Sequence, residues 1–157
     1  MRLLLLLAGK TRHAAYQQEM AEYQRRLNRY LPCEIREFKE EKPGRSETPA
    51  AYRRRQAPRL LEEFRKPAGL KLLLDERGPR RDSLEFSAFL EQALAGGQQQ
   101  LVFFCGGPFG YDPSLRREAD YLISLSPLTF PHELARLLLC EQLYRALTII
   151  RNEPYHY

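Results

Sequence analysis

Five short apolar runs, each followed by a longer segment with helical patterning, constrain the fold of this 157-residue chain more than any other feature. Strands that alternate with helices in this way imply a mostly parallel sheet with helices on both faces, so the expected fold class is α/β. The length fits one domain with a sizeable core, which we expect to span residues 1–157. The predicted strands are Arg2–Ala8, Cys33–Phe38, Leu70–Leu74, Leu101–Cys105 and Tyr121–Leu125.

Proline, serine and aspartate residues mark where the intervening helices begin. A proline is tolerated in the first turn of a helix, and a short polar side chain can cap its first N–H groups. The second strand alternates apolar and charged residues, which favours a position nearer the sheet edge. The helices are predicted from about His13 to Tyr30, from Pro49 or Ala50 to near Pro67, after Ser83 as N-cap, after Asp112 as N-cap, and from Pro131 or His132 to Ile150.

The last of these helices is apolar around most of its circumference, with leucine or isoleucine at eight positions between 134 and 150. Such a helix must be covered on nearly all sides. In so small a domain the sheet covers one side, and we expect a second subunit to cover another. The sequence therefore predicts a homodimer.

A small-molecule pocket is predicted where Leu101–Cys105 runs directly into Gly106 and Gly107. In parallel α/β sheets, ligands bind outside the carboxyl ends of the strands. Glycine lets the main chain approach such a ligand without a side chain between them. The loop 125–130 after the last strand would face this glycine pair. The alternative for Gly106 and Gly107 is an ordinary turn after a strand, without a ligand. No Gly-x-Gly-x-x-Gly or Gly-Lys-Ser/Thr motif follows a strand, which excludes the common dinucleotide and phosphate loops.

The excess positive charge lies in the first half of the chain. Residues 1–66 contain sixteen Lys and Arg against nine Asp and Glu, whereas residues 67–157 contain nine against eleven. Cationic side chains in such excess suit a polyanion such as a nucleic acid, because they displace counterions from phosphates. Solvated helix faces would give the same pattern.

Three cysteines, at positions 33, 105 and 140, are far apart and odd in number. We therefore expect reduced, buried thiols and neither a disulfide framework nor a metal site. The Leu3–Leu7 run is too short to span a bilayer, and charged residues follow it at once. These features predict a cytoplasmic protein that is not attached to a membrane.

Four motifs in order give the chain a specific resemblance. They are Gly-Gly-Pro-x-Gly at 106–110, Leu-Ser-x-Leu-Thr-Phe-Pro-His at 125–132, Glu-Gln-Leu-Tyr-Arg-Ala at 141–146, and Tyr155-His156. On these motifs, the chain resembles the bacterial 23S ribosomal RNA pseudouridine-N3 methyltransferases of the SPOUT, or trefoil-knot, class. The resemblance covers the whole length. It implies a C-terminal trefoil knot, a homodimer with the active site at the subunit boundary, and S-adenosyl-L-methionine as methyl donor.

Residue by residue, the resemblance assigns cofactor-binding positions at the three strand ends: Leu74, Gly106, Leu125, Ser126, Pro127, Leu128, Thr129 and Phe130. Gly107 is added to them because it too lets the main chain approach the ligand. The first candidates for the chemistry are His156, Tyr155 and Arg145, and the fourth is His132, which could equally cap or begin the last helix. Methyl transfer to N3 of pseudouridine requires in-line approach and loss of the N3 proton, and a histidine suits proton handling. The structural alternatives are that Tyr155 and His156 belong to a frayed chain end, and that Arg145 only forms an ion pair with Glu141.

Two positions depart from the family pattern. Phe109 stands where an acidic or polar residue is frequent after Gly-Gly-Pro, and Tyr157 stands where a basic residue usually follows Tyr-His. An aromatic side chain could stack on a base, while a missing cation would weaken phosphate contacts.

On the resemblance, methylation of 23S ribosomal RNA on the assembled ribosome is the leading hypothesis. The alternatives are a knotted methyltransferase for another RNA such as transfer RNA, and a non-catalytic ribosome-binding protein of the same fold.

Overall fold

The computed structural model describes residues 1–156, and the Tyr157 departure lies outside the described residues. Five strands form one sheet in the order β2-β1-β4-β3-β5, and every pairing is parallel. The strands are β1 (Arg2–Ala8), β2 (Cys33–Phe38), β3 (Leu70–Leu74), β4 (Gln100–Cys105) and β5 (Tyr121–Ile123). This confirms the α/β prediction and the edge position of the second strand.

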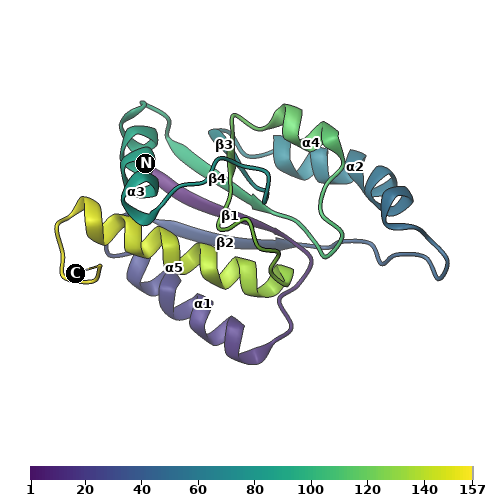
Figure 1. Ribbon diagram of the computed structural model, residues 1–157, viewed down its shortest axis with the longest axis horizontal. Coiled ribbons are helices and arrows are strands. Elements are labelled where there is room, and N and C mark those ends of the chain that lie inside the picture. Colours follow the sequence, from purple (N-terminus) through teal and green to yellow (C-terminus); the bar gives the residue numbers. More distant parts are fainter. Residues whose placement is uncertain (157) are drawn as a thin grey trace.

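Helices cover both faces of the sheet (Figure 1). They are α1 (Ala14–Leu27), α2 (Pro49–Arg65), α3 (Ser83–Ala95), α4 (Pro113–Glu118) and α5 (His132–Ile150). Side chains of a strand point alternately to its two faces, and the buried core divides accordingly. Leu3, Leu5 and Leu7 pack with α1, α3 and α5, whereas Leu4 and Leu6 pack with α2 and α4.

Four predicted boundaries were wrong. The fourth strand begins at Gln100, one residue before the predicted Leu101, and the other three differ for local reasons. The first helix ends at Leu27 and not near Tyr30, because the Asn28 side chain accepts from Cys33 N–H and donates to the Gln24 carbonyl. The N-cap of α3 is Asp82 and not Ser83, because Asp82 and Glu85 form a reciprocal capping box.

The fifth strand ends at Ile123 and not at Leu125. Ser124 already turns away from the sheet, and its hydroxyl donates to the carbonyl groups of Glu76 and Ser126. The remaining start points agree with the structure: Pro49 follows the Thr48 cap, Pro113 follows the Asp112 cap, and α5 begins at His132.

All three cysteines are buried free thiols, as predicted. Burial raises the pKa of the Cys33 and Cys105 thiols to about 12. Within residues 1–156, no helix is long and apolar enough to cross a membrane, and no group of three His, Cys, Asp or Glu side chains could hold a metal ion.

Candidate functional site

A cleft of about 670 Å³ opens at the carboxyl edge of the sheet. It lies between the loops that follow β3, β4 and β5 and the start of α5. This volume is in the range of pockets that hold a nucleotide-sized ligand. Eight of the nine predicted cofactor positions line it, whereas Pro127 belongs to the same loop but lies outside the lining described for residues 1–156. The eight are Leu74, Gly106, Gly107, Leu125, Ser126, Leu128, Thr129 and Phe130.

Gly106 has a steric reason to be glycine. A Cβ at this position would stand closer than 3.0 Å to the Cε1 and Cζ atoms of the buried Tyr111 ring. Gly106 N–H donates to the Tyr111 hydroxyl at 2.5 Å, and that hydroxyl donates to the Phe104 carbonyl at 3.3 Å. Burial raises the pKa of Tyr111 well above its ordinary value, so the hydroxyl stays protonated and keeps both bonds. The aromatic ring thus fixes the turn that makes one wall of the cleft.

Polar contacts join the loops on the opposite side of the cleft. Buried Asp75, directly after β3, accepts from Arg116 at 2.6 Å. The next residue, Glu76, accepts from the Thr129 hydroxyl at 3.1 Å. Sequence reasoning assigned no role to Asp75, Glu76, Tyr111 or Arg116. Their position at a strand end was the available signal for Asp75 and Glu76, whereas Tyr111 and Arg116 gave none.

The beginning of α5 closes the cleft with His132 and Ala135. Burial, with the nearby Arg136 cation, lowers the pKa of His132. Arg136 itself is fully buried. Its guanidinium donates to the carbonyl groups of Ala8 and Gly9 and to the Thr11 hydroxyl, the last two at 3.1 and 3.0 Å. These bonds fasten the first turns of α5 to the carboxyl end of β1.

Of the four candidates for the chemistry, His132 lies at the cleft, whereas the other three meet at the other end of α5. Arg145 forms an ion pair with Glu141 at 2.6 Å, and its Nη1 lies 3.4 Å from His156 Nδ1. Tyr155 donates to Glu141 at 3.2 Å and packs edge-on against Tyr144 with the ring centres 4.8 Å apart. The tail, residues 151–156, is therefore folded back onto α5. Of the two alternatives, the ion pair between Arg145 and Glu141 is confirmed, whereas Tyr155 and His156 are not frayed.

These three candidates do not reach the cleft of their own chain. His132 and Arg145 are thirteen residues apart on one helix, which corresponds to roughly 20 Å at 1.5 Å per residue. Figure 1 shows the end of the chain beyond the far end of α5. Of the described residues, Arg145, Tyr155 and His156 all lie outside the cleft lining.

An all-parallel sheet with a glycine-walled, nucleotide-sized cleft at its carboxyl edge defines an α/β protein that binds a small cofactor. Comparison with known proteins narrows the class. Residues 1–156 match the family model described as "Predicted SPOUT methyltransferase". The chain belongs to the SPOUT methyltransferase family.

Individual relatives match over essentially the whole of both chains. The chain is 44% identical to "Ribosomal RNA large subunit methyltransferase H" of Geotalea daltonii over 157 residues, covering 100% of each chain. The protein of the same name from Trichlorobacter lovleyi is 41% identical over 100% of each chain. The one from Porphyromonas gingivalis is 38% identical over 100% of this chain and 99% of its own.

Family membership implies a trefoil knot, as the resemblance predicted. The structure shows how closely the chain segments pass in this region. A Cβ on Gly78, in the loop after β3, would stand 2.9 Å from the Ser124 nitrogen, where the chain leaves β5. Asp75 N–H donates to the Ile123 carbonyl at 2.9 Å in the same place. Only a glycine fits at this crossing.

S-adenosylmethionine is the methyl donor of SPOUT methyltransferases, and the cleft fits it. Gly106 and Gly107 line the cleft with main chain only, and Leu74, Leu125 and Phe130 give it apolar walls. Asp75 and Glu76 are acidic groups along a cleft whose ligand carries a sulfonium cation. The predicted cofactor therefore agrees with the shape and the chemistry of the lining.

Proposed function

We propose that this protein transfers a methyl group from S-adenosylmethionine to N3 of a pseudouridine in 23S ribosomal RNA, on the assembled ribosome. The observation that carries the proposal is the full-length similarity to several large-subunit ribosomal RNA methyltransferases. The cleft supports it, because eight predicted cofactor positions surround one cavity. Because ribosomes are the proposed substrate, we propose that the enzyme works in the cytoplasm.

The residues of the chain contribute position and proton handling. When bound, the cofactor supplies an electrophilic methyl group on its sulfonium. The substrate nitrogen must lose its proton, and His156 is the proposed acceptor. Arg145 lies beside it, and the Tyr155 hydroxyl is hydrogen-bonded to Glu141 of α5.

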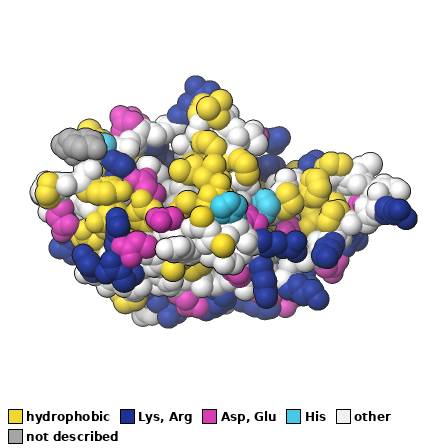
Figure 2. Space-filling view, turned by 90° about the horizontal axis from the view of Figure 1, so that it is seen from below, with side chains coloured by type: hydrophobic (Ala, Val, Ile, Leu, Met, Phe, Trp, Pro, Cys, Tyr) yellow, Lys and Arg dark blue, Asp and Glu magenta, His cyan; other side chains and the backbone are white. Residues whose placement is uncertain are grey.

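A homodimer resolves the separation between the cleft and the tail. His156 contacts Arg145, which lies roughly 20 Å along α5 from His132 at the cleft, so we propose that the tail of one subunit serves the cleft of the other. The half-buried Leu134 and Leu138 of α5 are not among the described residues that build the two cores, and Leu128 at the cleft is 70% exposed. Figure 2 shows hydrophobic side chains gathered at the centre of the face on which α1 and α5 lie, with histidines at their border. We propose that the second subunit covers this face.

Part of the basic excess remains available to RNA. Arg25 and Arg26 pair with Glu22, and Arg55 pairs with Glu41 and Glu47. Arg54 is exposed, and Arg53 donates to the Phe109 carbonyl at 3.3 Å at the rim of the cleft. The helix α2 thus brings cations to residues 106–110, which we call the cofactor loop, where a phosphate backbone must pass for a base to enter.

The test is transfer of labelled methyl to ribosomes that lack the modification, with separated subunits and transfer RNA in parallel, followed by nucleoside analysis. We expect 3-methylpseudouridine, and only with assembled ribosomes. Label on transfer RNA alone would support the other knotted enzyme. Neither label nor cofactor binding would support the non-catalytic ribosome-binding protein.

The composite site has its own test by subunit mixing. Gly106→Ala disables the cleft and His156→Ala disables the tail, so each homodimer should be inactive. A mixed dimer contains one site in which both halves are intact, and mixing should therefore restore activity. No recovery in mixtures that demonstrably exchange subunits would mean that each chain uses its own tail.

A further inference from the structure

Gly107, in the cleft wall, meets an unexpected neighbour on its outer side. A Cβ on Gly107 would stand closer than 3.0 Å to three atoms of the Glu40 carboxyl group. Glu40 is 67 positions earlier in the chain, just after β2. The same carboxyl group approaches Gly9, whose Cβ would lie 3.2 Å from Glu40 Oε2 and 4.0 Å from Arg136 Nη2. Glu40 therefore fills the space between the ends of β1 and β4, directly behind the cofactor loop.

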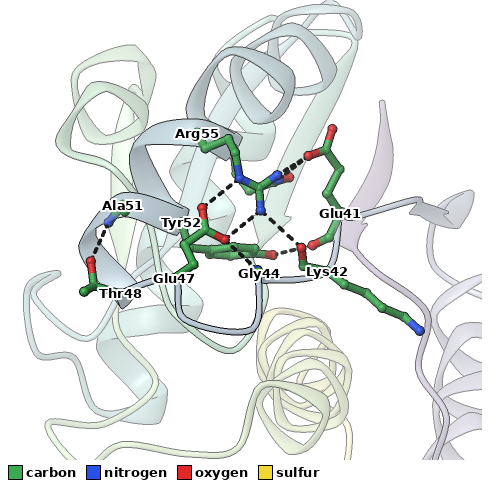
Figure 3. Close-up of polar contacts among 9 residues, drawn as sticks. Glu41, Lys42, Gly44, Glu47, Thr48, Ala51, Tyr52 and Arg55 are labelled. Atoms are coloured by element: carbon green, nitrogen blue, oxygen red, sulfur yellow. Dashed lines mark hydrogen bonds and ion pairs between the residues drawn. The ribbon is translucent and has the colours of Figure 1, made fainter.

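The segment that carries Glu40 is held by α2. We call residues 39–48, which join β2 to α2, the strap. Arg55 binds Glu47 through both nitrogens of its guanidinium edge, at 2.7 and 2.8 Å, and also contacts Glu41 and the Lys42 carbonyl (Figure 3). A single exposed ion pair contributes little, but a bidentate network with backbone contacts fixes a geometry. The strap is irregular in structure, yet it is fastened at several points.

Tyr52 connects the strap to the cofactor loop. Its hydroxyl donates to the Glu41 carbonyl at 2.9 Å and also interacts with the Glu40 carboxyl group. Its buried ring packs edge-on against Phe109, with centres 5.1 Å apart. Arg53, one residue further along α2, donates to the Phe109 carbonyl. Phe109, which departs from the family pattern, is thus held by two residues of α2.

We propose that Glu40 is a positioning residue of the cofactor site, which seats Gly107 from behind while Tyr52 and Arg53 hold Phe109. The proposal rests on the proposed function, because it assigns Glu40 to a loop that binds S-adenosylmethionine. Gly107 does not have a positive φ, so its backbone would accept an alanine, and the Glu40 carboxyl group is what excludes the methyl group. If the Glu40 side chain were free to move, it would make room for the methyl group. If its position is fixed, the methyl group must displace the main chain at residue 107.

This difference makes a double-mutant cycle decisive. Cofactor affinity would be measured by calorimetry for the wild type, Gly107→Ala, Glu40→Ala and the double variant. The free-energy cost of overpacking is typically large enough to change a binding constant tenfold. We therefore expect Gly107→Ala to weaken cofactor binding about tenfold or more. Glu40→Ala should weaken it about threefold, and the double variant should match Glu40→Ala because the space is then open. Multiplying effects in the double variant would overturn the proposal.

Three controls separate positioning from folding. Glu91→Ala removes an exposed glutamate of α3 and should leave affinity unchanged. Glu40→Gln keeps the shape and should retain binding better than Glu40→Ala. Amide hydrogen exchange over residues 106–110 should be faster in Glu40→Ala than in wild type, a readout that remains if Gly107→Ala folds poorly; unchanged exchange would overturn the inference.

Kinetics distinguish this inference from the proposed function. In Glu40→Ala, KM for S-adenosylmethionine should rise while kcat changes less, because Glu40 does not touch the reacting atoms. A wild type that fails to bind the cofactor would overturn the proposed function and this inference together. A wild type that binds it with no coupling between Glu40 and Gly107 would overturn this inference alone.

Discussion

Replacing the buried Arg136 by methionine should cost this protein much of its stability. Methionine fills most of the same volume but cannot donate to the carbonyl groups of Ala8 and Gly9 or to the Thr11 hydroxyl. Three lost hydrogen bonds of about 1 kcal/mol each, two of them to carbonyls away from water, give a loss of about 3 kcal/mol in the free energy of unfolding. For a chain of this size, that corresponds to a fall in Tm of about 6–12 °C.

The assay is urea unfolding followed by circular dichroism, with the m-value compared between variants. Arg29→Met, on the exposed surface of the turn after α1, is the matched control and should change the unfolding free energy by less than about 0.5 kcal/mol. Cofactor affinity should fall with Arg136→Met as well, since Ala135 lines the cleft. An unfolding free energy within about 1 kcal/mol of wild type would refute the reasoning, because the desolvation cost of the guanidinium would then offset its hydrogen bonds.

Three further predictions follow from the geometry of the cleft and the core. Gly106→Ala should abolish cofactor binding by calorimetry and lower stability by about 1–3 kcal/mol, because its methyl group would overlap the Tyr111 ring; Gly96→Ala, which has room, should do neither. All three cysteines should resist iodoacetamide at pH 8 until the protein is unfolded, as measured by mass spectrometry, because their thiol pKa values are raised. His132 has a lowered pKa when folded, so its contribution to stability should be complete above pH 6.5 and fall as the pH drops below that value. Substituting His132 by Asn should flatten this part of the stability profile, and an unchanged profile would exclude the histidine as its cause.

Local sequence patterns were sufficient for the elements and for the location of the cleft. The run Leu101–Cys105 is apolar on every residue because β4 is buried on both faces, and a glycine pair directly after it could only be a strand end. Since all carboxyl ends of parallel strands share an edge, the loops 106–110 and 125–130 had to face each other. Capping was less certain, because Asp82 and Ser83 are both good caps and only the position of Glu85 decides between them.

Long-range packing around the cleft gave no such signal. Glu40 and Gly107, or Asp75 and Arg116, are far apart in the chain, and no periodicity relates their positions. Arg136 looks like any surface arginine of an amphipathic helix until the fold places it against the end of β1. The tail motif indicated candidate catalytic residues, but it did not indicate that they would lie at the opposite end of α5 from the cleft.

The amino-acid sequence by itself determined the α/β class, the strand-end cleft, its glycine wall and the residues that carry the family motifs, because each depends on neighbours along the chain. Only the tertiary structure decided that Glu40 packs against Gly107, which charged side chains are buried, and how far the tail lies from the cleft of the same chain. These depend on contacts between residues that are distant in sequence. Their energies come from burial and close packing, which exist only once the sheet and its helices have assembled.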